Sequence, residues 1–297
     1  MALIRFGSRN RKRYNDYFST TIFSSSRSYS VTEEQAMQIP AVKSCVELIS
    51  STISQLPIYL YKELPNGDVE QIDDERLLIL NNAANKYDSA SKIKKLIVKD
   101  LLLYGKAYLY RKDNELHHLP ANKVHMEAYT EDDITISMKT YTYYSPTSTV
   151  TLSEDEVIVF ETGTEGVLVD GDQVLQQALN ELDYSKNVLK NGALPIGVLK
   201  ASTRLTEAAL NRLKQSFNNL YSSTKNAGKT IVLEEGLDYQ PISLNPNELQ
   251  LNEVTKQTLA SICRLFNVPQ AMVDASANKY SSLEMNNLHF LQYTISP

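Results

Sequence analysis

The spacing of apolar residues changes along this chain, and that change restricts the fold more than any other feature. Apolar residues recur with helical spacing from residue 40 to residue 56 and again from 91 to 104, which predicts two amphipathic helices. From Ala107 to Glu161 the period is two, which predicts strands of an antiparallel sheet between turns. The two periods together predict an α+β domain, which we expect to cover residues 31–170.

Short polar motifs predict where these helices begin and end. Thr32-Glu33-Glu34-Gln35 is a capping box, in which Thr32 and Gln35 satisfy each other's backbone amides at a helix start. Pro57 ends the helix that starts near residue 40, and Gly105 stands where the next helix needs a C-terminal cap. Pro65-Asn66-Gly67-Asp68 predicts a turn between two short strands.

The N-terminal residues differ from this domain in composition. Residues 1–30 are rich in Ser and Arg and show no apolar period. We therefore expect a flexible basic arm there. Its first cationic side chains are Arg5, Arg9, Arg11, Lys12 and Arg13.

The second half of the chain predicts two long helices on either side of a smaller segment. Helices are expected over residues 171–191 and 246–267, each with one apolar stripe. Between them, residues 192–245 alternate between strand and helix patterns and predict a βαββ segment. A polar stretch over residues 268–282 precedes a last amphipathic segment over residues 283–297.

Composition limits the classes of function. Hydrophobic residues make up 42% and charged residues 22% of the 297 residues, as in globular proteins. No apolar run approaches the roughly 20 residues that span a bilayer, so no membrane partner is expected. The formal net charge of -5 argues against gripping nucleic acid with the whole surface. Cys45 and Cys263 both lie on apolar helical stripes, which predicts buried free thiols in a reducing compartment.

Gly228-Lys229-Thr230 matches the end of a phosphate-binding P-loop, but its context does not. The motif requires a glycine five residues before Gly228, and that position is Ser223. A helix pattern precedes the motif and a β-branched run follows it, the reverse of the strand, loop and helix that bind phosphate. We interpret it as a helix-to-strand turn.

No other residues assemble a chemical site in the sequence. His117 and His118 are adjacent in a predicted strand and point to opposite faces, so they cannot chelate together, and His125 and His289 stand alone. The acidic runs over residues 131–133 and 154–156 fit solvated turns. We expect no catalytic, cofactor-binding or metal-binding residues, no cofactor and no enzymatic activity.

The order of several segments resembles tailed-phage portal proteins of the HK97 type. In the second half these segments are VLKNGALPIGVLKA (188–201), LTEAALNRLKQSF (205–217), NAGKTIVLEEGLDYQPISLNPNELQL (226–251) and ICRLFNVPQAMV (262–273). Upstream, AVKSCVELISSTISQLPIYLYK (41–62) and LLLYGKAYLYR (101–111) are also similar to the family. The resemblance covers nearly everything after residue 31.

The resemblance implies a portal fold with an α/β wing, paired stem helices and a βαββ clip insert. Residues 31–170 would be the wing, 171–191 and 246–267 the stem, 192–245 the clip and 268–282 a tunnel loop. Residues 283–297 would start a long wing helix, whose remainder and the helical crown of the family do not follow. We expect either a shortened form of a longer chain or a naturally short product.

The implied function is that of a ring at one capsid vertex, usually of about twelve subunits, through which double-stranded DNA is packaged and ejected. Implied partners are copies of the chain, DNA, the terminase, the head-tail connector and the major capsid or scaffold protein. The implied location is the virion, and the bacterial host cytoplasm during assembly. The alternatives are a related head or tail interaction protein without a conduit role and, on Gly228-Lys229-Thr230 alone, a nucleotide-binding enzyme.

Two groups of residues follow as candidates. The tunnel loop would line the channel with small polar residues and one cation, and Lys279 is the candidate for transient phosphate contacts; its channel residues would be Ser276, Asn278, Lys279 and Tyr280. The clip would supply contacts to partners and ring neighbours through Lys200, Arg204, Glu234, Glu235 and Tyr239.

Overall fold

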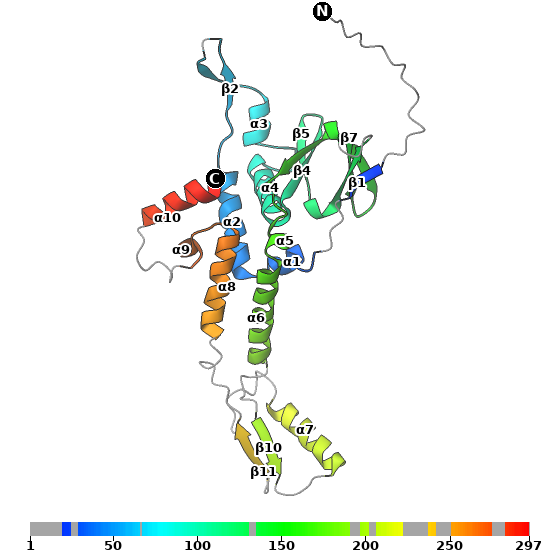
Figure 1. Cartoon of the computed structure of the whole chain (residues 1–297), viewed down its shortest axis with the longest axis vertical. Helices are drawn as coiled ribbons and strands as arrows, with labels where there is room; N and C mark the ends of the chain where they lie inside the picture. The colour runs from blue at the N-terminus through cyan, green and yellow to red at the C-terminus, as the bar shows by residue number, and fades with distance from the viewer. Residues whose placement is uncertain are drawn as a thin grey trace, which may run out of the picture. The chain divides into compact units, whose positions relative to one another are not determined.

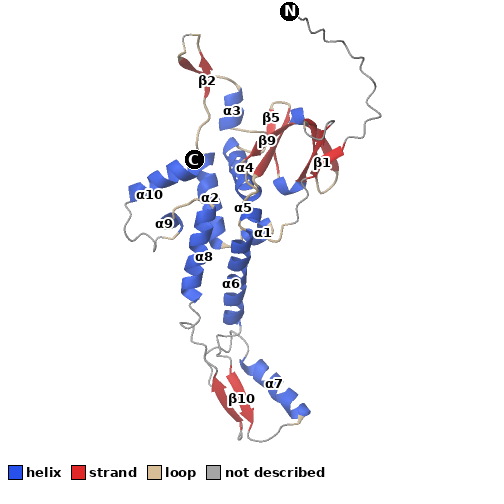
Figure 2. Cartoon of the chain, in the orientation of Figure 1, coloured by secondary structure: helices blue, strands red, loops and turns tan. Residues whose placement is uncertain are grey.

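The computed structural model describes residues 20–24, 29–65, 67–130, 135–190, 197–201, 206–221, 237–241, 251–274 and 283–296 (Figure 1). They belong to two compact units. The first contains residues 58–93 and 107–160 together with the strand at 20–24, and the second contains residues 29–57, 94–106 and the described residues from 161 onward. Helices and strands occupy separate segments (Figure 2), which confirms the predicted α+β class.

The first unit contains two larger β-sheets, besides a two-stranded ribbon. The four-stranded sheet has the order β1-β6-β7-β8 and the three-stranded sheet the order β5-β4-β9. The strands are β1 (Thr20–Ser24), β4 (Lys106–Lys112), β5 (Glu115–Leu119), β6 (Val124–Thr130), β7 (Ile136–Tyr144), β8 (Thr149–Ser153) and β9 (Val157–Glu161). Pairing of β6 with β7, of β7 with β8 and of β4 with β5 is antiparallel, as the period of two predicts.

Part of the expected basic arm is a strand. Thr20–Ser24, within the predicted arm of residues 1–30, forms β1 and pairs antiparallel with β6. Its sequence TTIFS consists mostly of β-branched and aromatic residues, which suit a strand. Pairing with a neighbouring strand thus orders residues that have no helical or alternating apolar pattern.

The core of the first unit follows from the alternation along its strands. Each strand from β4 to β9 supplies one buried side chain to this core. In chain order these are Tyr108, Leu119, Val124, Tyr141, Leu152 and Val157. Tyr108 and Tyr141 pack with their ring centroids 6.0 Å apart. These tyrosines bury rings of large area, so they contribute much of the hydrophobic stabilisation of the unit.

The predicted turn at residues 65–68 joins a two-stranded ribbon. β2 (Leu60–Glu63) pairs antiparallel with β3 (Val69–Ile72), which confirms the hairpin. Gly67 has a φ of 86° and its amide donates to the carbonyl of Leu64 at 2.9 Å. Glycine adopts this left-handed backbone without steric cost. The helix α3 (Arg76–Asn81) follows. The Asn81 side-chain oxygen accepts a hydrogen bond from the Ile58 amide, and the Asn81 side-chain nitrogen donates to the Ile58 carbonyl, both at 2.8 Å.

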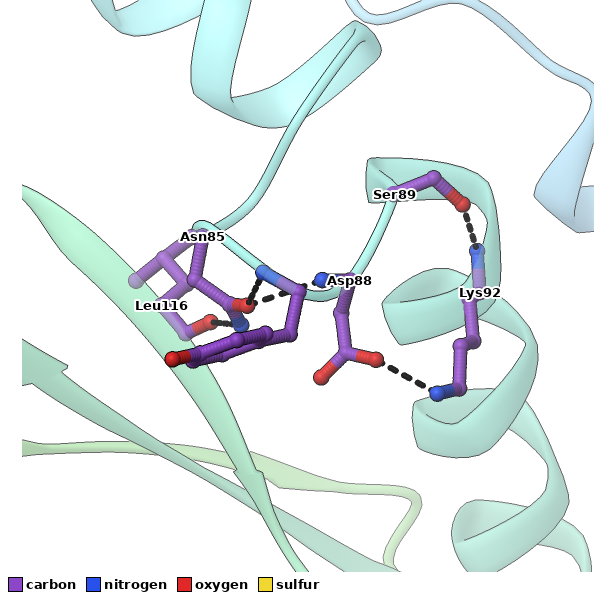
Figure 3. A network of polar contacts seen from close by, with 6 residues as sticks. Asn85, Asp88, Ser89, Lys92 and Leu116 are labelled. Carbon is purple, nitrogen blue, oxygen red and sulfur yellow. Dashed lines mark hydrogen bonds and ion pairs between the residues drawn. The ribbon is translucent and has the colours of Figure 1, made fainter.

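A buried asparagine holds the loop between α3 and the next helix, α4 (Ala90–Tyr104) (Figure 3). The Asn85 side-chain oxygen accepts from the amides of Tyr87 and Asp88, both at 2.9 Å, and its amide donates to the Leu116 carbonyl at 2.8 Å. The Asp88 carboxylate then pairs with Lys92 one turn into α4. This network fixes the start of α4 beside β5.

The second unit is mainly helical. Its helices, besides residues 94–104 of α4, are α1 (Glu33–Ala36), α2 (Pro40–Ser54), α5 (Val167–Asp170), α6 (Asp172–Lys190), α7 (Glu207–Tyr221), α8 (Leu251–Leu265), α9 (Gln270–Val273) and α10 (Leu283–Phe290), and a π-helical segment η5 (Leu291–Ile295) ends it. Thr32 and Gln35 form the predicted capping box at α1. Leu56, expected on the buried stripe of α2, is 49% exposed because the helix ends at Ser54.

Charged side chains tie α4 to α1 and α2. Lys99 Nζ lies 2.6 Å from Glu33 Oε1, and Lys95 Nζ lies 2.8 Å from Glu47 Oε2. The Tyr104 hydroxyl donates to the other Glu33 oxygen at 2.9 Å. Burial, and then the bond to Glu33, raise the pKa of Tyr104 far above its ordinary value. Tyr104 is therefore a neutral donor throughout the physiological range.

The segments predicted as βαββ contain β10 (Gly197–Ala201), α7 and β11 (Leu237–Pro241), with β10 and β11 paired antiparallel. A third strand of the predicted βαββ segment is not found among the described residues, and residues 222–236 lie outside them. Thr206 accepts from the amide of Ala209 at 3.4 Å and so caps the start of α7. Among the described residues, none of the helices has the length and apolar character needed to cross a membrane.

Candidate functional site

The helices α6 and α8 pack side by side (Figure 1) and are the described parts of the two long helices predicted at residues 171–191 and 246–267. Each has one apolar stripe, and the stripes meet. From α6 the buried side chains are Leu175 and Ala178, from α8 they are Ile262 and Cys263, and the buried Phe266 follows directly after α8. Hydrophobic burial of this kind holds helix pairs together in water.

A polar cluster is built into this apolar seam. The Thr258 hydroxyl of α8 donates to Glu181 Oε1 of α6 at 2.6 Å. The Gln177 amide donates to the same Glu181 oxygen and to the Thr258 oxygen, each at 3.0 Å. Only 5% of Thr258 is exposed. A hydrogen bond to a charged acceptor is stronger than one between neutral groups, and partial burial strengthens it further. This cluster therefore fixes the register of α6 against α8.

A pocket of about 220 Å³ adjoins the polar cluster. It lies between the first turn of α2 and the facing sides of α6 and α8, and Glu181 and Thr258 form part of its wall. The rest of its wall is mostly apolar and includes Ala41, Ala178, Leu182, Leu259 and Ile262. Its mostly apolar lining suits a small apolar group.

Two glycines bring the end of α4 against the start of α5. Gly105 has a φ of 70° and Gly166 a φ of 81°. A Cβ at Gly105 would lie 2.1 Å from the Thr164 carbonyl oxygen, and one at Gly166 would lie 2.4 Å from the Leu103 carbonyl oxygen. Gly105 caps α4 as predicted, whereas the contact with Gly166 had no signal in the sequence. Together they set where the chain enters α5 and α6.

Most of the predicted partner and channel residues lie outside the described residues. Ser276, Asn278, Lys279 and Tyr280 of the tunnel loop do so, as do Arg204, Glu234 and Glu235 of the clip. Lys200 is exposed near the end of β10, and Tyr239 lies in β11, opposite Leu199. Their roles remain predictions. Within the stretch 268–282, Gln270–Val273 forms the short helix α9.

Among the described residues, the histidines considered for metal chemistry do not lie in one cluster. Gly228-Lys229-Thr230 lies outside the described residues. His117 lies 3.3 Å from Glu115 and His125 lies 3.6 Å from Glu127, each beside a carboxylate of its own strand. Among the described residues there is no group of three or more His, Cys, Asp or Glu side chains placed to hold a metal ion. Cys45 and Cys263 are buried free thiols, as predicted.

Sequence reasoning did not single out the polar cluster. Thr258 lies one helical turn before Ile262, so it occupies a position of the apolar stripe of α8. A polar residue on a buried stripe signals a hydrogen-bond partner on the facing helix. The partner, Glu181, could not be found without knowing which helix α8 packs against.

Comparison with known proteins identifies the family. The family described as phage portal protein matches residues 40–297. The portal protein of Enterobacteria phage HK97 is 24% identical over 284 residues, which cover 90% of this chain and 66% of that protein. The probable portal protein of Streptomyces phage phiC31 is 25% identical over 292 residues, which cover 90% of this chain and 62% of the relative. The chain thus spans about two thirds of the length of these relatives or slightly less.

Solved structures share the fold. An HK97-family phage portal protein from Corynebacterium diphtheriae superposes with a TM-score of 0.66 at 17% identity, covering 91% of this chain and 86% of that one. A chain from the neck of an empty gene transfer agent particle has a TM-score of 0.60 at 19% identity, covering 89% and 76%. Because the family match includes both units, the helix pair α6 and α8 and the segment from β10 to β11, the chain belongs to the phage portal protein family, of the HK97 type.

Proposed function

We propose that this chain is a portal subunit that assembles with copies of itself into a ring at one capsid vertex, through which DNA is packaged and ejected. The observation that supports it most is the family match over residues 40–297. It includes most of both compact units, the helix pair α6 and α8 and the β10-α7-β11 segment. Copies that join through a heterologous, head-to-tail interface form a closed ring when the rotation between neighbours divides a full circle.

The paired helices α6 and α8 serve as the stem in this proposal. A stem must keep its shape while DNA moves past it, and the Gln177–Glu181–Thr258 cluster supports that role by locking the register of the pair. The β10-α7-β11 segment serves as the clip, which docks the terminase during packaging and the head-tail connector afterwards. Lys200, Arg204, Glu234, Glu235 and Tyr239 are its proposed contact residues.

Residues 268–282, which include α9, serve as the tunnel loop in this proposal. Sliding DNA requires weak phosphate contacts, because each neutralised phosphate adds salt-sensitive affinity that would hold the DNA in place. The stretch from Asp274 to Ser282 carries one cation, Lys279, and one acid, Asp274. Ser276, Asn278 and Tyr280 complete the proposed lining. The proposed activity is structural, with no catalytic step assigned to any residue.

Counting copies in particles tests this function. Isotope-labelled peptides of the chain and of the capsid protein would measure their ratio by mass spectrometry, and gold-labelled antibody would locate the chain. We expect about twelve copies per particle, all at one vertex. Copies at every vertex, or in the tail alone, would contradict the portal role and favour a head or tail interaction protein.

A further inference from the structure

The two cysteines of the chain lie together although they are far apart in the sequence. Cys45 is on α2 and Cys263 is on α8, two helices that pack against each other. They are 0% and 2% exposed, and both are free thiols. The chain has two cysteines in total, so all its thiols meet at this one place.

The pocket beside α6 approaches this pair. Ala41 stands one helical turn before Cys45, and Leu259 stands one turn before Cys263, so each shares a helix face with its cysteine. Ala41 and Leu259 both line the pocket of about 220 Å³. The pocket wall therefore lies one helical turn from each cysteine along its helix, although neither cysteine lines the pocket.

The two thiols are hydrogen-bonded to each other. A hydrogen bond between the two thiols, followed by burial, raises the pKa of Cys45. The same bond lowers the pKa of Cys263, against burial and the Asp274 carboxylate, which raise it. The thiolate is the nucleophile in disulfide exchange, so the directions of these two shifts favour Cys263 for the first attack.

We propose that Cys45 and Cys263 form an oxidative cross-linking site, at which a small neutral disulfide joins α2 to α8 covalently. The Cys263 thiolate attacks one sulfur of the reagent, the reagent's S–S bond breaks, and one reagent thiol leaves with the proton that Cys263 lost. Cys45 then loses its proton and attacks the Cys263 sulfur, releasing the second reagent thiol. Two protein thiols are oxidised to one disulfide, and the reagent disulfide is reduced to two thiols.

A disulfide brings its two sulfurs to roughly 2.05 Å, so closure requires the Cys45 and Cys263 side chains to move toward each other. A disulfide between Cys45 and Cys263 would close a loop that contains most of the chain. A longer closed loop restricts the unfolded state more than a short one does. Disulfides persist on virions outside the reducing cytoplasm. In a portal, a consequence that rests on the proposed function, the cross-link would stiffen the subunit after release of the particle.

The test uses the full chain and hydroxyethyl disulfide under native conditions, followed by intact-mass measurement and digestion without reductant. We expect the protein to lose the mass of two hydrogens, to gain no reagent and to yield one linked peptide pair containing Cys45 and Cys263. The thermal unfolding midpoint should rise by about 5 °C or more and return on reduction. Retention of both thiols, or a gain of one or two hydroxyethylthio groups, each being half of the reagent, would overturn the proposal.

Single substitutions provide the matched controls. Cys45→Ser should leave Cys263 to take up one hydroxyethylthio group, with no rise in the unfolding midpoint, while Cys263→Ser should react more slowly at Cys45. Equal rates in the two variants would overturn the order of attack. A chain that forms rings but keeps both thiols overturns the cross-link alone, and a chain that cross-links but forms no rings overturns the proposed function alone.

Discussion

Gly105 and Gly166 approach so closely that a Cβ on Gly166 would lie 2.5 Å from the amide nitrogen of Gly105. Both glycines have a positive φ, and Thr162 donates to the Gly105 carbonyl through its amide at 3.1 Å and its hydroxyl at 3.2 Å. The end of α4 and the start of α5 thus meet backbone against backbone. The position of α6 depends on this junction, since α5 leads directly into it.

Replacing Gly166 by Ala should therefore destabilise the protein strongly. The added methyl group meets backbone atoms of residues 103–105, which cannot rotate away, and the residue must also adopt a φ of 81°. We expect a loss of about 3 kcal/mol or more in the free energy of unfolding. Urea denaturation followed by circular dichroism measures it.

Gly163→Ala is the matched control. Gly163 has a φ of 77°, but a Cβ there would have no atom within 4 Å beyond its chain neighbours, so only the backbone strain applies. Its expected cost is about 1 to 2 kcal/mol. Equal losses in the two variants would show that the close approach of Gly166 to Gly105 is not stabilising the junction.

Thr258→Val should loosen the pair of α6 and α8. Valine keeps the shape of threonine but removes the hydroxyl that donates to Glu181 at 2.6 Å. We expect a loss of about 1 to 3 kcal/mol in the free energy of unfolding, because the acceptor is charged. Thr255→Val, at an exposed position of the same helix, is the control and should change stability by less than about 0.5 kcal/mol. Equal losses of stability in the two variants would contradict the role of the Gln177–Glu181–Thr258 cluster in holding α6 against α8.

The Asp74 carboxylate should titrate unusually low. Its pKa falls from the ordinary 3.8 to about 2, chiefly through the hydrogen bond from the Arg76 side chain and then that from the Arg76 amide. A lowered folded-state pKa stabilises the fold above the unfolded pKa, and that contribution is lost as the pH falls from about 4 to about 2. Carbon NMR of the Asp74 carboxyl measures the midpoint. Arg76→Gln should move the midpoint upward, and an unchanged midpoint would contradict the assigned cause.

Gly228-Lys229-Thr230 should bind no nucleotide. The missing glycine at Ser223 and the order of helix before strand deprive the motif of a phosphate-binding loop. Calorimetry with millimolar ATP and Mg²⁺ should give no saturable heat, and Lys229→Ala should behave as the unmodified chain does. Saturable binding that Lys229→Ala abolishes would establish a nucleotide site.

Local signals in the sequence predicted the features that depend on neighbouring residues. The Thr32 capping box, the Gly105 cap and the hairpin turn at Gly67 each need a few adjacent residues, and all three are confirmed. The extension of the α2 stripe to Leu56 was wrong, because a period cannot show that the helix ends at Ser54.

Features that join distant segments could not be predicted in this way. The bond between Thr258 and Glu181, the approach of Gly166 to Gly105 and the meeting of Cys45 with Cys263 each depend on which helix packs against which. The pairing of Thr20–Ser24 with β6 depends likewise on a distant strand. The resemblance to portal proteins supplied the order of the segments but not these contacts.

Negative-stain electron microscopy of the purified chain tests most directly whether it is a portal subunit that assembles into rings. We expect end-on views of rings with a central hole and one rotational symmetry, with the ring population increasing with protein concentration. Particles that stay the size of a single chain at every concentration would contradict the portal role.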